Sequence, residues 1–165
     1  WELSGHLAGQ LGLPVPVVSR VANNPWVEWL IRRNRGSGVE SVIPKGPGGA
    51  RKIVEVMRAG GHVAMLVDQK MNDGIAVPFM GRKAMTPPAA ARLAFKFDCP
   101  IVAGRIERVG GAYFRAILEP PIPLPKSGDQ ERDVFDVMVE VNAKIERWVR
   151  ARPGQWLWLH NRWPN

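Results

Sequence analysis

Asp68 and Gln69 are the first side chains whose type and position suit chemistry. They follow an apolar segment, residues 62–67, that is typical of a buried strand. In open α/β sheets, ligands collect just beyond the carboxyl ends of strands, where an acid could orient a substrate. The same position also suits an aspartate that caps a turn running from Lys70 to Gly74. The sequence alone leaves both interpretations of Asp68 open.

Three arginines, Arg32, Arg33 and Arg35, gather at the end of a predicted helix over residues 25–34. Cations at a helix C-terminus interact favourably with the helix dipole and the last carbonyl groups. A solvated basic face is the ordinary interpretation of such a cluster, and a binding site for an anionic substrate is the alternative.

Several other chemistries are disfavoured. The single cysteine, Cys99, excludes a disulfide framework and a cysteine-based zinc site. The three histidines are scattered along the chain, so we expect no metal centre and no cofactor. The glycines at 46–49 match neither phosphate-loop pattern and are interpreted as the entry to a helix.

Helix and strand patterns alternate along the chain, which predicts an α/β fold with a mixed sheet flanked by helices. Pro16 favours an edge position for its strand, Asn24 and Thr86 are expected to cap helices, and residues 70–83 are expected to form a loop with an extended piece at 76–79. The predicted helices are 3–11, 25–34, 47–59, 87–97 and 129–152, and the predicted strands are 15–19, 39–43, 62–67, 101–108 and 112–118.

The composition indicates one globular domain, residues 1–165, with 45% hydrophobic and 23% charged residues. Lys and Arg outnumber Asp and Glu by 23 to 15, and the net charge of +8 indicates an anionic partner. Nucleic acid is one candidate, but the basic residues are dispersed and do not interleave with aromatic residues as a stacking platform requires. The three tryptophans within residues 155–163 are interpreted as a segment that closes the core, with membrane contact as the alternative.

Several short motifs occur in a characteristic order. They are Trp1-Glu2-Leu3, Arg20 with Asn24-Pro25, Arg35-Gly36, Leu66-Val67-Asp68-Gln69, Val77-Pro78-Phe79-Met80-Gly81, Thr86-Pro87-Pro88, and the run from Pro153 to Trp163 that contains Gln155-Trp156-Leu157-Trp158. In this order they resemble the lipid A late acyltransferases, the lauroyl/myristoyl-transferase family of Gram-negative lipopolysaccharide synthesis. The resemblance covers nearly the whole chain and implies the glycerolipid-acyltransferase-like fold.

The resemblance implies that Glu2 is the acid of a catalytic motif in which a histidine precedes an acid by five positions. That histidine would lie upstream of Trp1, and the residues five positions after the three histidines present are Leu11, Val67 and Asn165. The N-terminal membrane helix of the family is missing as well. We therefore expect a truncated acyltransferase domain that is inactive by itself.

The resemblance also implies an acyl carrier protein as donor and a hydroxyl of a lipid A precursor as acceptor, at the cytoplasmic face of the inner membrane. Arg35 and Asp68, with Gln69 beside it, would bind and position substrate, and Arg20 would contact a phosphate or the carrier. Nucleic acid is not an expected partner. The alternatives are acylation of another glycolipid or a lysophospholipid, and a non-catalytic basic module that binds lipid or nucleic acid.

Overall fold

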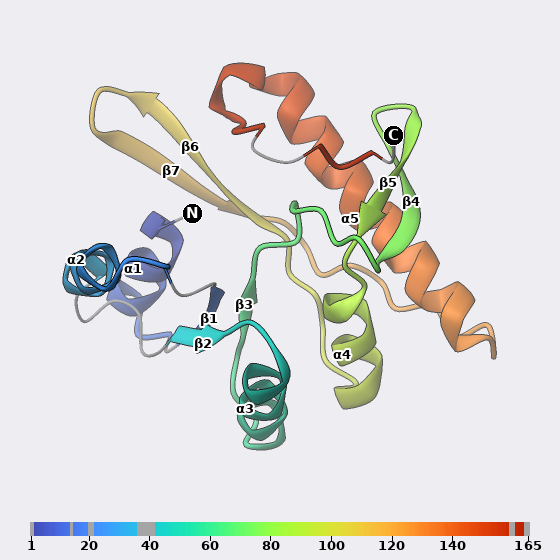
Figure 1. Cartoon of the computed structure of the whole chain (residues 1–165). Helices are drawn as coiled ribbons and strands as arrows, with labels where there is room; N and C mark the ends of the chain where they lie inside the picture. The colour runs from blue at the N-terminus through green and yellow to red at the C-terminus, as the bar shows by residue number, and fades with distance from the viewer. Residues whose placement is uncertain (1, 14, 20–21, 36–41, 159–160, 164–165) are drawn as a thin grey trace. The chain divides into compact units, whose positions relative to one another are not determined.

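The computed structural model describes residues 2–13, 15–19, 22–35, 42–158 and 161–163 (Figure 1). The chain forms two compact units, Trp1–Leu66 and Val67–Asn165. Helices alternate with small parallel and antiparallel sheets, which confirms the predicted α/β class. The described strands belong to three small sheets, where the sequence pattern had suggested one mixed sheet.

Unit 1 contains a parallel sheet in the order β2-β1-β3. Its strands are β1 (Val17–Ser19), β2 (Val42–Pro44) and β3 (Ala64–Met65). The predicted edge position is wrong, because β1 is the central strand. Pro16 precedes the strand, where its missing N–H costs nothing, and its carbonyl oxygen accepts a hydrogen bond from the Ala64 nitrogen at 3.0 Å.

Three helices complete unit 1: α1 (Glu2–Gln10), α2 (Pro25–Arg35) and α3 (Pro47–Arg58). The predicted cap of α2 is confirmed, since Asn24 Oδ1 accepts from the Trp26 nitrogen at 2.9 Å. The glycine-rich segment is a helix entry, as expected. A Cβ at Gly49 would lie 1.7 Å from the carbonyl oxygen of Pro44, so only glycine lets α3 start against the end of β2.

Unit 2 contains a hairpin of β4 (Ile75–Phe79) and β5 (Arg82–Thr86), joined by Met80 and Gly81. Both turn residues have positive φ, 52° and 76°, as tight hairpin turns require. The predicted extended piece at 76–79 is confirmed as β4, whereas the loop predicted over 70–83 is wrong at residues 82–83, which begin β5. Pro78 is tolerated in β4, because in a two-stranded sheet each strand keeps one free edge, where a missing N–H costs little.

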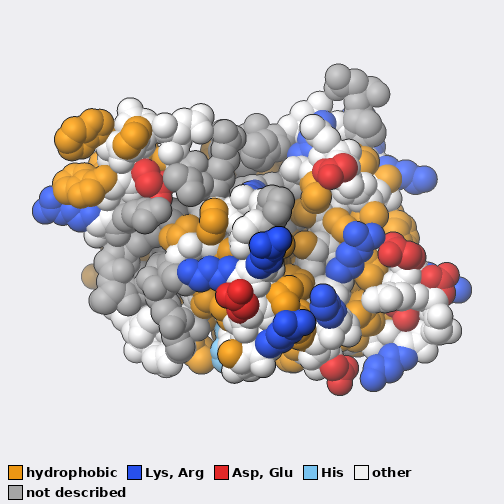
Figure 2. All heavy atoms as spheres, turned by 60° about the horizontal axis from the view of Figure 1, so that its bottom comes forward, with side chains coloured by type: hydrophobic (Ala, Val, Ile, Leu, Met, Phe, Trp, Pro, Cys, Tyr) orange, Lys and Arg blue, Asp and Glu red, His pale blue; other side chains and the backbone are white. Residues whose placement is uncertain are grey.

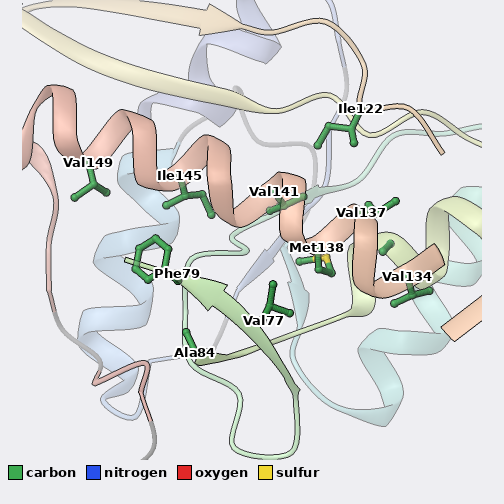
Figure 3. Packing of buried hydrophobic residues seen from close by; sticks show 11 residues of the cluster. Val77, Phe79, Ala84, Ile122, Val134, Val137, Met138, Val141, Ile145 and Val149 are labelled. Atoms are coloured by element: carbon green, nitrogen blue, oxygen red, sulfur yellow. The ribbon is translucent and has the colours of Figure 1, made fainter. Parts of the chain in front are cut away.

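The longest helix, α5 (Gln130–Ala151), carries the core of unit 2. Asp129 caps it, with its carboxylate accepting from the Glu131 and Arg132 nitrogens. Figure 3 shows the apolar stripe of α5 facing Val77 and Phe79 of β4. The buried residues of the stripe are Val134, Val137, Met138, Val141, Ile145 and Val149.

The rest of unit 2 consists of α4 (Ala89–Phe97), the hairpin β6 (Gly104–Gly110) and β7 (Tyr113–Leu118), and a short 3₁₀ helix at Pro153–Gln155. The predicted hairpin is confirmed. The predicted Thr86 cap is wrong, because Pro88 occupies the N-cap position of α4 without a side-chain hydrogen bond. Thr86 ends β5 and is fully buried, where its hydroxyl donates to the Ala84 carbonyl oxygen at 3.0 Å.

Candidate functional site

Glu2 and Arg35 lie on two helices of unit 1 that pack against each other. Glu2 is the first residue of α1 and Arg35 is the last residue of α2, and α1 contacts α2. Their side chains, and the whole of Arg20, lie outside the described residues. The structure therefore brings the two helices together, and the roles of the three side chains stay predictions.

Asp68 and Gln69 belong to unit 2, in a bend that begins three residues after β3 ends. Both side chains are half-buried. The following turn closes through the backbone, with the Gly74 nitrogen donating to the Met71 carbonyl oxygen at 3.0 Å. Closure of this turn therefore does not require Asp68 as a cap. The function of the Asp68 carboxylate stays a prediction.

A buried polar network at the centre of unit 2 joins Thr86 of β5, Asn142 of α5 and Arg162 near the C-terminus. Arg162 Nη2 donates to Asn142 Oδ1 at 2.9 Å and to Thr86 Oγ1 at 3.2 Å. Asn142 Nδ2 donates to Thr86 Oγ1 at 3.1 Å and to the Pro78 carbonyl oxygen at 3.2 Å. These bonds fix the amide orientation of Asn142 and use both its oxygen and its nitrogen.

Arg162 is an unusual member of this network because it is a cation that is only 1% exposed. Its guanidinium lies over the ring of Phe79, with the central carbon 4.2 Å from the ring centroid. Burial lowers the pKa of Arg162, and the negative charge of Asp68 opposes that shift. The Asp68 charge therefore acts on Arg162, although the two side chains make no ion pair or hydrogen bond among the described residues.

Sequence patterns did not single out Asn142 or Arg162, and they gave Thr86 a different role, that of a helix cap. The available signal was a cation inside the C-terminal run of tryptophans. This run partly closes the core, as expected: Trp156 and Trp163 pack on the core cluster and against Phe79. The interpretation fails for Trp158, which is half exposed although it stacks on Trp163.

Other groups with chemical potential contribute little to this region. Burial raises the pKa of the Cys99 thiol, so its thiolate is disfavoured as a nucleophile. Within the described ranges, no three His, Cys, Asp or Glu side chains gather as metal ligands would. No helix in the described part of the chain combines the length and the apolar character that crossing a membrane requires.

Comparison with known proteins gives this arrangement a context. The family model for the bacterial lipid A biosynthesis acyltransferases matches residues 1–165. No curated protein matches the chain. The family match includes every motif that carried the sequence resemblance, together with both units of the structure. The chain therefore belongs to the bacterial lipid A biosynthesis acyltransferase family and is an acyltransferase.

Proposed function

We propose that this domain transfers a fatty acyl chain from acyl carrier protein to a hydroxyl group of a lipid A precursor. The observation that carries the proposal is the family match over residues 1–165. The reaction is direct. The acceptor oxygen bonds to the thioester carbonyl carbon, the carbon–sulfur bond breaks, and the carrier leaves as a free thiol.

Glu2 is the acid of the catalytic dyad in this proposal. A neutral histidine five positions upstream takes the proton of the acceptor hydroxyl and returns it to the leaving sulfur. A carboxylate at that spacing orients the imidazole and stabilises its cation, as in a catalytic triad. An enzyme nucleophile is not required, and the one cysteine of the chain is disfavoured for that role because burial raises its thiol pKa.

Four other residues bind and position substrate in this proposal. Arg35, with Arg20, binds the phosphates of the acceptor or the acidic surface of the carrier, and Asp68 and Gln69 orient the reacting groups. Both substrates are anionic, so a domain with a net charge of +8 accelerates encounter with each of them.

We further propose that α2 rests on the cytoplasmic face of the inner membrane. Its apolar residues are unusually open to water: Trp26 is 79% exposed and Trp29 is 53% exposed, and Val27 and Leu30 are exposed as well. The Arg33 guanidinium lies 5.3 Å from the ring centroid of Trp29. Figure 2 shows hydrophobic side chains with basic ones beside them on the side where Figure 1 draws α1 and α2. Tryptophan beside a cation is the arrangement expected of a helix that lies in an anionic lipid interface.

Binding to vesicles tests the proposed role of α2. Trp26→Ser with Trp29→Ser should reduce binding to vesicles that contain anionic lipid at least about tenfold, since two indole anchors are lost. Tyr113→Ser is the matched control, because Tyr113 is 77% exposed on β7 and should not affect binding. Equal losses in both variants, or equal binding of the wild type to neutral vesicles, would contradict this part of the proposal.

The dyad is tested by Glu2→Gln in the protein that includes the segment upstream of Trp1. Transfer of a labelled acyl chain from acyl carrier protein to a lipid A precursor should show a fall in kcat of about 10²-fold or more, with a smaller change in KM. A kcat within about twofold of wild type would remove Glu2 from the dyad. Transfer to a lysophospholipid or another glycolipid in preference to lipid A precursors would favour the alternative acceptor.

A salt titration separates the enzyme from a basic nucleic-acid-binding module. The domain should retain binding to the lipid A precursor or to acyl carrier protein at physiological salt, while its binding to duplex DNA falls steeply and shows no sequence preference. Arg35→Ala should weaken lipid or carrier binding and leave the salt dependence of DNA binding nearly unchanged, since one of 23 basic residues is lost. Sequence-dependent DNA binding at physiological salt, without lipid or carrier binding, would contradict the proposed function.

A further inference from the structure

The guanidinium of Arg162 has more donors than its surroundings can use. Nη2 is bonded to Asn142 and Thr86, whereas Nε and Nη1 are buried and make no hydrogen bond with the described residues. Asn142 cannot compensate, since its oxygen already accepts from Nη2 and its nitrogen already donates twice. Thr86 Oγ1 already accepts from two donors. A buried donor without a partner costs about 1–3 kcal/mol, and more on a charged group.

Backbone hydrogen bonds bring the Asp68 segment and the Arg162 segment to the same edge of β5. The nitrogen of Met85 donates to the Arg162 carbonyl oxygen at 2.9 Å. The carbonyl oxygen of Met85 accepts from the Met71 nitrogen at 3.3 Å. One residue of β5 therefore holds both segments on its edge away from β4, and only two residues separate Asp68 from Met71 along the chain.

The charges agree with this placement. The groups that Arg162 touches are an amide, a hydroxyl and an aromatic ring, and none of them is anionic. A buried cation needs a compensating charge. Asp68 is the acid whose field acts on Arg162, and the Asp68 side chain is half-buried, so water screens the interaction only in part.

We propose that Arg162 is a positioning residue for Asp68: the buried guanidinium, fixed by Thr86, Asn142 and Phe79, holds the Asp68 carboxylate in its working orientation through the attraction of its charge, without a direct hydrogen bond between them. The proposal rests on the proposed function in one respect, the role of Asp68 at the substrate. The cation is rigid because three elements fix it: β4, β5 and α5. The Asp68 bend is irregular backbone, and an electrostatic anchor gives it the defined orientation that a substrate-positioning carboxylate requires.

A double-mutant cycle tests the pairing without any assay of activity. Arg162→Met and Asp68→Asn are made singly and together in the full chain, and chemical denaturation gives the unfolding equilibrium constants. Each single change should leave one charge without its partner, so the double variant should be about tenfold less destabilised than the two single effects predict. Arg82→Met is the matched control for the arginine, since Arg82 lies exposed over Trp163, and exposed Asp73→Asn is the control for the acid. The control pair should be additive.

If Arg162→Met does not fold, Arg162→Lys replaces it in the cycle. Lysine keeps the charge and loses the planar fork, so the expected non-additivity falls to about threefold. Additive effects of Asp68→Asn with either arginine variant, within about twofold, would overturn the pairing.

A kinetic cycle tests positioning in the acyltransferase with its upstream segment. Arg162→Met should lower kcat per folded molecule at least about tenfold with KM changed less than about threefold, and Arg162→Lys should recover part of the loss. Asp68→Asn should add little to the kcat loss in the Arg162→Met background, because the carboxylate is already misplaced. A purely structural Arg162 would instead reduce the folded fraction and leave kcat per folded molecule unchanged. If the wild type proves inactive toward every acyl acceptor, the proposed function fails, while the denaturation cycle still decides whether the pair exists.

Discussion

Two polar clusters on α5 differ in how fully their donors are used. In the first, the Glu119 carboxylate accepts from Lys144 Nζ at 2.8 Å, from Trp148 Nε1 at 2.7 Å and from Arg105 Nη1 at 3.1 Å. Anion and cations alternate here, and all remain partly open to water. In the second, Arg162 donates to neutral partners, and two of its nitrogens make no hydrogen bond within the described part of the chain.

This difference distinguishes a cluster whose role is to stabilise the fold from a cluster that suits a functional site. Glu119 directly follows β7 and ties the β6–β7 hairpin to α5; a two-stranded hairpin is marginal without such packing. Both oxygens of the Glu119 carboxylate accept hydrogen bonds, so this group needs no further partner. The Arg162 cluster keeps a buried cation with unused donors, which folding alone does not favour. Such incomplete satisfaction is typical of functional sites.

Loss of Asn142 should produce the largest effect on stability. Asn142→Ala removes the acceptor that holds Arg162 Nη2 and two donor bonds to Thr86 and Pro78. We expect destabilisation of about 3 kcal/mol or more, because a buried cation loses its best partner. Urea denaturation measures it, with Asp136→Ala on the exposed face of α5 as the control. A loss below about 1 kcal/mol would show that the Arg162 cluster contributes no more than a surface contact.

The Arg162 network also shows where sequence analysis stops. Thr86 and Arg162 are 76 residues apart, and Asn142 and Arg162 are 20 apart, so no local pattern connects them. Periodicity predicted α5 and its stripe, because helical burial repeats within one segment. It gave Thr86 the ordinary role of a helix cap, which is wrong because the hydroxyl is used by the buried network. The extended piece at 76–79 was predicted, but its pairing with β5 was missed for a similar reason, because packing against the distant α5 decides the outcome.

The sequence predicts the candidate site, like the fold, only in part. Motif order identified the family, and the family match bears that out, while the roles of Glu2, Arg35 and Asp68 stay predictions. The residues that hold a site's side chains in place come near them only when the chain folds, as Arg162 comes near the Asp68 segment. Residue type alone gives no sign of burial, and a single arginine in a sequence is ordinarily exposed.

Glu119→Gln should have the second largest effect. The substitution keeps the shape of Glu119 and leaves Lys144 and Arg105 without their shared anion. Since the cluster is partly solvated, we expect a loss of about 1–2 kcal/mol in chemical denaturation, reduced at high salt. A more specific effect is expected in the β6–β7 hairpin, whose backbone amide protons should exchange with solvent faster than in the wild type. A Glu119→Gln loss that exceeds that of Asn142→Ala would reverse the ranking of the two clusters.

The pH dependence of stability should distinguish the clusters by a smaller margin. Hydrogen bonds donated by Lys144 and Trp148 lower the pKa of Glu119, and the hydrogen bond that Lys144 donates to Glu119 raises the pKa of Lys144. The Glu119 contribution is therefore complete above the ordinary glutamate pKa of 4.5 and is lost as the pH falls through the lowered value. The Lys144 contribution is complete below 10.5 and is lost as the pH rises through the raised value.

Denaturation midpoints measured between about pH 2 and 7 test this dependence. Glu119→Gln should reduce the acid slope, and Asn142→Ala should keep the wild-type slope, because neither Asn142 nor Thr86 titrates. If Glu119→Gln leaves the pH dependence of the denaturation midpoint unchanged, other acidic residues determine the loss of stability at low pH. Glu146 is the first of these to test, since hydrogen bonds from Arg150 and the Met80 nitrogen lower its pKa in the same direction.

The smallest effect should come from an ion pair that resembles neither cluster. Arg92 Nη2 of α4 lies 3.2 Å from Glu131 Oε2 of α5, and the two side chains are 53% and 74% exposed. Water already solvates both charges, so Glu131→Gln should cost less than about 0.5 kcal/mol and the loss should vanish at high salt. Urea denaturation at two salt concentrations measures it. A loss near that of Glu119→Gln would mean that charge alone, rather than burial and the number of shared hydrogen bonds, sets the contribution of these pairs along α5.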